Sequence, residues 1–356
     1  MRRIYLIRHG ETELMNGSRV CLGGKLDLPL SRQGRIQAAM LARCFEGVPL
    51  KAVYCSGLSR SIQTAETVGA GRCPVLVLEG IRELDAGAWE GRDFSCLKKE
   101  EPELFEARGR DHALIPPGGE FYSHGAARLA KALAGLPVEE GDIAVVAHAG
   151  LNRAFLSLFL GQSYSKNRSI PQEHCCVNVL RQDQHGLQLS AVGILPWDVP
   201  GETEILTLWQ DRQLPESVRC HSRAVCRAAL EMADSLEAKG IRLDRKLLWT
   251  AALLHDLCRL EHSHAEAAAE QLRDLGFLRL ARIVELHHGG AFAPTLDEAQ
   301  VLFLADKMVR GEERVSIERR FAESLRKCSS AEALAAHDRR LRQAREIHEK
   351  YRKATA

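Results

Sequence analysis

The chain shows no strong excess of charge of either sign and no long apolar run. Its 356 residues carry 49 Lys and Arg against 47 Asp and Glu, a formal net charge of +2. This balance gives no general argument for binding nucleic acid or a membrane surface. No run of about 18 apolar residues occurs, so we expect no membrane span. The N-terminus, Met1-Arg2-Arg3, has neither an apolar signal region nor a cleavage site, and we therefore expect a cytoplasmic protein.

The cysteine pattern also lacks the features of a metal or redox motif. The chain has 11 cysteines, but no pair has CxxC spacing, and Cys44, Cys55 and Cys258 lie within apolar segments. Without a secretion signal, this pattern predicts buried free thiols in a reducing compartment rather than disulfides.

The length predicts two domains, and the pattern changes character near residue 195. Residues 1–195 alternate between strand-like and helix-like stretches, which is typical of an α/β domain with a mostly parallel sheet. The expected buried strands are 4–7, 53–55, 75–78 and 143–147, with a closing hairpin of 174–181 and 187–194. The expected helices between them are 32–46, capped by Ser31, then 59–68, 121–135 and 150–160.

The second half of the chain has no strand signals. Residues 196–215 hold three prolines and are predicted to be a linker. Residues 216–311 are predicted to be all-α, and 312–356 to be a helical C-terminal extension. The expected helices are 216–239, 244–258, 262–275, 278–288 and 297–310. The extension is basic, but without interleaved aromatics we interpret it as a solvated helical tail; a nucleic-acid-binding scaffold is the alternative.

The first group of chemically active residues begins with Arg8 and His9, directly after the first expected strand. An arginine binds phosphate oxygens through its planar fork, and a histidine can attack phosphorus to form a phosphohistidine. Arg60 lies at a strand-to-helix junction, and His148 follows the strand that ends at Ala147. Glu83 lies in a glycine-bearing loop, where a protonated carboxylic acid would donate its proton to the leaving oxygen. Asp85 and Glu90 are nearby alternatives for this acid.

Five motifs in order resemble those of the histidine phosphatase superfamily, also called the phosphoglycerate mutase-like family. They are RHGET, SxLxRxxQTA, RExxxGxWEG, Pro117-Gly118-Gly119-Glu120 and AHAG, and they span residues 3 to about 160. The resemblance implies a three-layer α/β fold, His9 as nucleophile and no cofactor. It also implies that Arg8, Arg60 and His148 bind the phosphoryl group and that Glu83 donates the proton.

Three departures from the family pattern fall on the substrate side. Asn16, a further candidate for phosphate binding, comes one position later than the family's asparagine, and the loop before Ser31 is longer. Phe121 stands where the family often has serine. The short form without long insertions resembles the small phosphatases of the α-ribazole phosphatase type, so we expect hydrolysis; mutase-type phosphoryl transfer is the alternative.

The second group begins with His255 and Asp256, next to each other within an apolar segment. A buried charge is costly unless it is paired or bound to a metal. The further candidate ligands on flanking helices are His221, His264, His287, His288 and Asp306. Imidazole and carboxylate together suit Fe, Mn, Zn, Co or Ni better than calcium.

The order H…HD…D resembles the HD-domain metal-dependent phosphohydrolases over residues 217–310. The resemblance assigns His221, His255, Asp256 and Asp306 as core ligands, and the extra His264, His287 and His288 resemble members that hold two ions. One of the last two histidines could instead contact substrate or be structural, and one or two ions remain open.

These interpretations together predict a bifunctional phosphohydrolase. The N-terminal domain would remove a phosphate from a small metabolite, and the HD domain would hydrolyse a phosphoester of a nucleotide or related compound. The alternative is a histidine phosphatase regulated by a non-catalytic, nucleotide-binding HD module. The sequence makes no prediction of oligomeric state.

Overall fold

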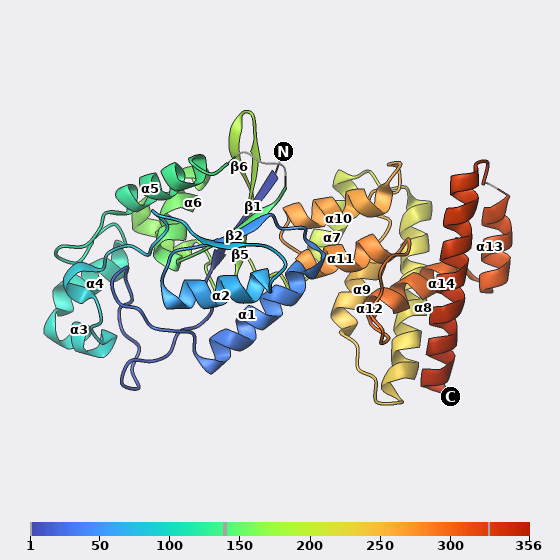
Figure 1. The fold of residues 1–356 in the computed structure, drawn as a ribbon, viewed down its shortest axis with the longest axis horizontal. Helices are drawn as coiled ribbons and strands as arrows, with labels where there is room; N and C mark the ends of the chain where they lie inside the picture. The colour runs from blue at the N-terminus through green and yellow to red at the C-terminus, as the bar shows by residue number, and fades with distance from the viewer. Residues whose placement is uncertain (1, 138–140, 327) are drawn as a thin grey trace. The chain divides into compact units, whose positions relative to one another are not determined.

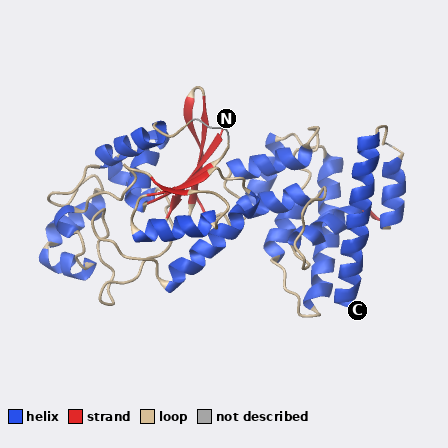
Figure 2. Cartoon of the chain, in the orientation of Figure 1, coloured by secondary structure: helices blue, strands red, loops and turns tan. Residues whose placement is uncertain are grey.

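The computed structural model describes residues 2–137, 141–326 and 328–356. The chain divides into two compact units, Met1–Trp197 with Asp274–Gly276, and Asp198–Arg273 with Phe277–Ala356. Figure 2 shows that the large sheet belongs to the first unit and that the second is built mainly of helices. None of the described helices is long and apolar enough to cross a membrane.

The first unit is organised around a six-stranded sheet in the order β3-β2-β4-β1-β5-β6. The four strands β1 to β4 pair in parallel, and β5 and β6 continue the sheet in antiparallel fashion. The strands are β1 (Arg2–Arg8), β2 (Ala52–Cys55), β3 (Val75–Val77), β4 (Ile143–Ala147), β5 (Val177–Asp183) and β6 (Gly186–Ile194).

Helices cover both faces of this sheet (Figure 1). The helices of the first unit are α1 (Arg32–Cys44), α2 (Ser59–Gly69), α3 (Phe94–Glu100), α4 (Pro102–Arg110), α5 (Tyr122–Ala134) and α6 (Ala149–Leu160). Of these, α3 and α4 lie away from the sheet (Figure 1). Successive side chains of a strand point to opposite faces. Thus Ile4 and Leu6 of β1 pack in a core with residues of α5 and α6, whereas the ring of Tyr5 packs against Phe45 just after α1, with 5.1 Å between centroids.

These observations confirm the predicted α/β fold class with a mostly parallel sheet, and they also show differences in detail. Strand β3 was expected to be buried, but it is an edge strand, and Val77 is 60% exposed. Helices α3 and α4 were not predicted at all. Their apolar residues are few, so no periodic pattern marks them, and no residue of α4 is buried.

The second unit contains α7 to α14 and one short hairpin. Its helices are α7 (Glu202–Asp211), α8 (Glu216–Glu237), α9 (Arg245–Leu254), α10 (His264–Asp274), α11 (Leu278–Leu286), α12 (Glu298–Lys307), α13 (Ile317–Leu325) and α14 (Ala331–Thr355). The hairpin pairs β7 (Val309–Arg310) with β8 (Glu313–Arg314). Helix α7 lies inside the segment expected as a linker, and its Trp209 donates a hydrogen bond to the carbonyl of Leu253.

Two expectations for this unit were wrong. The helix predicted for 244–258 ends at Leu254, because beyond it Leu257, Arg259 and Glu261 each bond to the carbonyl three residues back instead of four. The extension is not simply a solvated tail. Helix α14 packs against α8 and α12, and its residues Ala344 and Ile347 are buried.

None of the eleven cysteines, all of which lie within the described residues, forms a disulfide. Cys44, Cys55 and Cys258 are buried, as the sequence predicted, whereas Cys96 is exposed.

Candidate functional site

The parallel pairing of β1 and β4 brings the first two histidines together. Arg8, the last residue of β1, lies opposite Ala147, the last residue of β4. His9 and His148 therefore follow neighbouring strands at the same edge of the sheet, where their ring centroids are 5.1 Å apart. Both side chains are buried, at 6% and 0% exposure.

His9 is held in one orientation. Its Nδ1 lies 2.7 Å from the carbonyl oxygen of Gly10, and because a carbonyl only accepts, Nδ1 carries the proton. Nε2 then has a free lone pair. Burial lowers the pKa of His9 well below its ordinary value, and the charges of Arg60 and Arg8 lower it further. The ring is therefore neutral at physiological pH, and a neutral imidazole with a free lone pair is able to act as a nucleophile.

Arg60 is buried and Arg8 is partly buried, and both have donors to spare. Arg60 in the first turn of α2 donates to the carbonyls of Leu26 and Gly23, both at 2.9 Å. Arg8 donates to the carbonyl of Gln172 and lies 2.7 Å from Nε2 of His174. In the described part of the chain, Nε of each arginine is buried without a hydrogen-bond partner. Burial lowers the pKa of both guanidinium groups, a cost that a bound anion offsets.

His148 is positioned from the neighbouring strand end. Its Nε2 lies 2.7 Å from Oγ of Ser56, just after β2, and its Nδ1 is buried without a partner among the described residues. Burial lowers the pKa of His148 well below its ordinary value, and the adjacent His9 adds to this effect. A phosphoryl oxygen is the kind of group that would satisfy such an atom.

Glu83 lies at the beginning of α6, which His148 caps. Its Oε2 accepts from the backbone N–H of Gly150 at 3.0 Å, and its Oε1 accepts from that of Leu151 at 2.8 Å. The start of a helix attracts anions because its N–H groups are unpaired. Glu83 therefore shares this electropositive position with any phosphate held by His148.

The alternative carboxylates are engaged elsewhere. Oε1 of Glu90 accepts from the backbone N–H groups of Gly23, Lys25 and Leu26, at 3.0, 3.2 and 2.7 Å. Asp85 forms an ion pair of 2.7 Å with Lys25. Glu90 thus fixes the loop 23–26, and the carbonyls of this loop accept from the Arg60 guanidinium. Through these contacts Glu90 positions Arg60.

A cavity of about 300 Å³ lies beside the start of α6. Gly150 forms part of its wall, and α3 and α4 supply Phe94, Phe105 and Arg108. Arg153 and Arg168 add further positive charge to the lining. The cavity combines aromatic and basic groups and borders Gly150, whose N–H donates to Glu83. Helices α3 and α4, which were not predicted, therefore form part of the wall of this cavity.

Asn16 is the one N-terminal candidate that is not gathered into this cluster. It is exposed on a tight turn with φ 52, and no hydrogen bond within the described residues links it to Arg8, His9 or Arg60. Sequence reasoning also missed Ser56, Gln172 and His174. Ser56 follows a strand at the same sheet edge as His9, a signal that was available. Gln172 and His174 precede β5 and reach Arg8 only through the fold.

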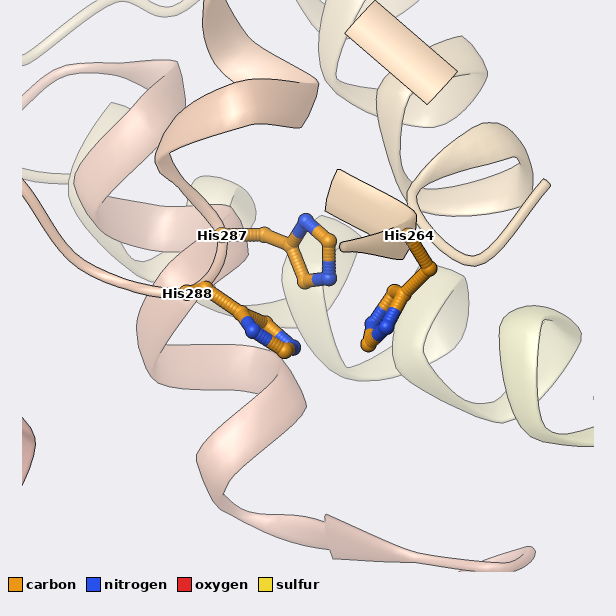
Figure 3. Close-up of side chains that lie close together, drawn as sticks. All are labelled: His264, His287 and His288. Atoms are coloured by element: carbon orange, nitrogen blue, oxygen red, sulfur yellow. The ribbon is translucent and has the colours of Figure 1, made fainter. Parts of the chain in front are cut away.

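Figure 3 shows three histidines of the second unit turned toward one another. His264 begins α10, and His287 and His288 follow α11. One nitrogen of each lies within 4.8 Å of the others. The side chains of His264 and His287 are buried, and His288 is partly buried.

A second group of potential ligands stands beside the first. It consists of His221 from α8, His255 directly after α9 and Asp306 from α12, again with ligand atoms within 4.8 Å of one another. Nε2 of His221 lies 3.2 Å from Oδ1 of Asp306.

Asp256 connects the two groups. Its Oδ1 lies 3.2 Å from Nε2 of His264 and 3.7 Å from Nε2 of His287. Its Oδ2 lies 3.7 Å from Nε2 of His255. A carboxylate between two ligand sets is suited to bridging a pair of ions. All seven candidate ligands taken from the sequence therefore converge.

The imidazoles are oriented as metal ligands require. Nδ1 of His221, His255 and His287 donates to the carbonyls of Gly311, Ala252 and Val284 respectively. Such a bond leaves Nε2 free to bind a metal. In the described part of the chain, Nε2 of His255 and of His287 is buried with no hydrogen-bond partner. The residues therefore fit a bound transition metal.

The protonation states of His255, His288 and Asp256 agree with this geometry. For His221, burial is outweighed by the bond to Asp306, which raises the pKa of this histidine. Burial lowers the pKa of His255 to about 4 and that of His288 to about 2, so both are neutral at pH 7. Burial opposes ionisation of Asp256, but the nearby His255 and His264 outweigh it and lower its pKa. Neutral imidazoles and ionised carboxylates are the forms that bind metal.

Comparison with known proteins yields two family matches. A family model of the histidine phosphatase superfamily (branch 1) matches residues 4–194, and one of the HD domain matches residues 218–311. Both families were predicted from the sequence, and both predictions are confirmed. The matches also support the prediction of a hydrolase acting on phosphoester bonds.

Curated relatives resemble the N-terminal half. The chain is 33% identical to adenosylcobalamin/alpha-ribazole phosphatase of Escherichia coli over 165 residues, 45% of this chain and 79% of that protein. It is 32% identical to the probable phosphoglycerate mutase GpmB of Proteus mirabilis over 184 residues, 50% of this chain and 84% of that protein.

A match to a longer relative is partial. The chain is 34% identical to 6-phosphofructo-2-kinase/fructose-2,6-bisphosphatase 1 of Rattus norvegicus over 165 residues, which is 46% of this chain but only 33% of that protein. Among solved structures, YhfR of Bacillus stearothermophilus matches with a TM-score of 0.49 and 28% identity, covering 53% of this chain and 96% of that one. On the family match over more than half of its length, the chain belongs to the histidine phosphatase superfamily (branch 1), and it carries an HD domain in its second half.

Proposed function

We propose that the chain is a bifunctional phosphohydrolase with a phosphohistidine phosphatase in residues 1–195 and a metal-dependent phosphohydrolase in residues 216–311. The observation that carries the first activity is the cluster of His9, His148 and two arginines at one sheet edge. The Nε atom of each arginine is buried without a partner among the described residues. A tetrahedral dianion is the ligand that such a cluster is built to hold.

In the first step Nε2 of His9 attacks the phosphorus atom. A nitrogen–phosphorus bond forms and the bond from phosphorus to the leaving oxygen breaks. Arg8, Arg60 and His148 contact the phosphoryl oxygens and stabilise the charge that they carry. Glu83 enters as the carboxylic acid and transfers its proton to the leaving oxygen, which departs toward the adjacent cavity.

In the second step water attacks the phosphohistidine. Glu83, now a carboxylate, accepts a proton from this water, and the bond between phosphorus and Nε2 of His9 breaks. Inorganic phosphate and neutral His9 result, and Glu83 is again protonated. The proposed substrate is a small phosphorylated metabolite whose leaving group suits a pocket of aromatic and basic side chains, since Phe105 and Arg108 line it.

The test uses p-nitrophenyl phosphate. We expect His9→Ala to lose at least about a thousandfold in kcat and Glu83→Gln to lose about a hundredfold or more. The matched control is His185→Ala, because His185 is exposed on the β5–β6 hairpin. Equal turnover by wild type and His9→Ala would refute the phosphatase assignment. Phosphate release in labelled water distinguishes hydrolysis from transfer to a second metabolite.

For the HD module, the supporting observation is that Asp256 lies between two ligand groups. One ion would be held by His221, His255 and Asp306, and a second by His264, His287 and His288, with Asp256 shared. When bound, Fe, Mn, Zn, Co or Ni would supply a hydroxide nucleophile and neutralise phosphoryl oxygens. The proposed substrate is a nucleotide or a related phosphoester.

Elemental analysis of the purified full-length protein tests this proposal. We expect close to two transition-metal ions per chain and metal-stimulated hydrolysis of a nucleotide. Protein that holds no such metal and hydrolyses no nucleotide would refute the catalytic HD assignment and favour a regulatory module. The control is His262→Ala, since His262 is exposed and belongs to neither ligand group.

A further inference from the structure

A cavity of about 410 Å³ in the second unit extends from the ligand groups to the C-terminal extension. Among the candidate ligands, His221, Asp256, His288 and Asp306 form part of its wall. The extension contributes Arg320, Phe321 and Ser324 from α13, and His337 and Arg340 from α14. All of these extension residues lie beyond the segment 218–311 that matches the HD domain. The extension therefore forms one side of this pocket, which residues 218–311 alone do not supply.

The extension is anchored to the parts of the unit that carry the ligands. The side chain of Gln343 on α14 donates to the carbonyl of Gly290, two residues after His288, at 2.8 Å. Nε2 of His337, which is buried, lies 3.0 Å from the carbonyl of Phe321, so α14 holds α13 directly. These contacts keep the cavity-facing side chains of both helices in place beside the ligand groups.

Two arginines of this wall differ in their pairing from Arg310, Arg314 and Arg319. Arg310 and Arg319 both lie near Glu323, and Arg314 pairs with Glu231. In contrast, the side chains of Arg320 and Arg340 have no carboxylate partner in the described part of the chain, and both are only partly exposed. Partly buried arginines that lack a carboxylate and face a cavity favour an anionic ligand.

The position of these arginines separates their role from that of the metal ligands. They come from α13 and α14, whereas the ligand groups come from α8 to α12. The cavity size is within the range of about 300–1,000 Å³ that is typical of small-molecule sites. It has room for more than a single phosphate.

We propose that the C-terminal extension forms a second anion subsite of the HD centre, in which Arg320 and Arg340 bind a phosphate other than the one that reacts. The substrate class is then a phosphoester with at least one further phosphate group. This inference rests on the proposed metal-dependent function of the HD module. It assigns the extension to substrate selection and leaves the reacting phosphate to the metal-ligating residues.

The test compares two probes that cannot be hydrolysed at their phosphorus–carbon bonds, methylenediphosphonate and methylphosphonate. Each is titrated calorimetrically into full-length protein reconstituted with Mn²⁺. The same titration of chelator-treated protein gives the contribution of the N-terminal phosphate pocket, which is subtracted. Mn²⁺ that is free in solution affects wild type and variants equally. The ratio of their dissociation constants for a probe therefore reports how much the two arginines contribute to binding.

We expect Arg320→Gln and Arg340→Gln each to weaken methylenediphosphonate binding at least tenfold and to change methylphosphonate binding less than twofold. The matched control is Arg339→Gln, because Arg339 is the exposed neighbour on α14. It should leave both affinities within twofold. Arg340→Lys should recover part of the diphosphonate affinity, since it retains the charge.

Bound manganese is measured on the same samples. If wild type holds manganese but both glutamine variants bind the diphosphonate as tightly as it does, the subsite proposal is wrong and the HD function stands. The proposal is also wrong if the variants weaken both probes equally, since that is a general effect of charge. If wild type holds no manganese or other transition metal, the proposed HD function itself fails.

Discussion

Replacement of Glu90 by glutamine tests how the phosphate pocket is held from a distance. Glu90 has no place in the proposed chemistry, but its Oε1 accepts three backbone N–H bonds from the loop 23–26, and its Oε2 accepts a fourth from Ala86 at 3.3 Å. The carbonyls of that loop in turn hold the Arg60 guanidinium. The side chain therefore acts on Arg60 through the backbone.

The magnitude follows from counting donors. A glutamine keeps its oxygen on the three loop N–H groups and turns its NH₂ toward the N–H of Ala86, so one bond is lost. The other three change from charged to neutral acceptors, and bonds to charged groups contribute roughly twice as much as neutral ones. Because Glu90 is only partly buried, we expect a net loss of about 2–4 kcal/mol in the free energy of unfolding.

The assay has two readouts. Urea unfolding of Glu90→Gln measures stability, and p-nitrophenyl phosphate hydrolysis under fully folding conditions measures kcat/KM, which we expect to fall at least tenfold as Arg60 shifts. The matched control is Glu79→Gln, since Glu79 is exposed in the same unit. A Glu90→Gln protein within about 0.5 kcal/mol of wild type and with unchanged kcat/KM would show that the loop does not depend on this carboxylate.

Three further predictions concern the metal ligands, protonation and packing. Asp256→Asn should reduce bound metal below half of the wild-type content by elemental analysis, while p-nitrophenyl phosphate hydrolysis stays unchanged; full metal content would refute its bridging position. Burial, then the charge of Arg60, lowers the pKa of His9, so its ring NMR signals should not titrate between about pH 8 and pH 5.5. The unfolded chain binds a proton on His9 more readily than the folded chain does. The free energy of unfolding should therefore fall as the pH drops below about 6.5, and His9→Asn should lessen this fall. Gly34→Ala should lower the free energy of unfolding by about 3 kcal/mol in urea, because a Cβ there would lie 1.9 Å from the carbonyl oxygen of Glu11; wild-type stability would contradict the close packing of these two segments.

Local sequence patterns determined much of the first unit. The apolar run 143–147 is β4, and Ser31 caps α1 by accepting from the N–H of Gly34, as predicted. These features depend on residues within a few positions of one another, which is why they are readable in the sequence. The motifs around His9 and His148, with three others in order, also resemble those of the family that matches residues 4–194.

The tertiary structure alone decided how the groups meet. The position of Asp256 between two ligand groups depends on the packing of five helices, and nothing near it in the sequence states its partners. The sequence places both Glu83 and Glu90 in one loop, and only the fold shows that Glu83 reaches the start of α6. The basic extension has the composition of a solvated tail, yet Ala344 and Ile347 bury one face of α14 against α8 and α12. Composition reports the average polarity of a helix, whereas its function here depends on which face is covered and which arginines the fold turns toward a cavity.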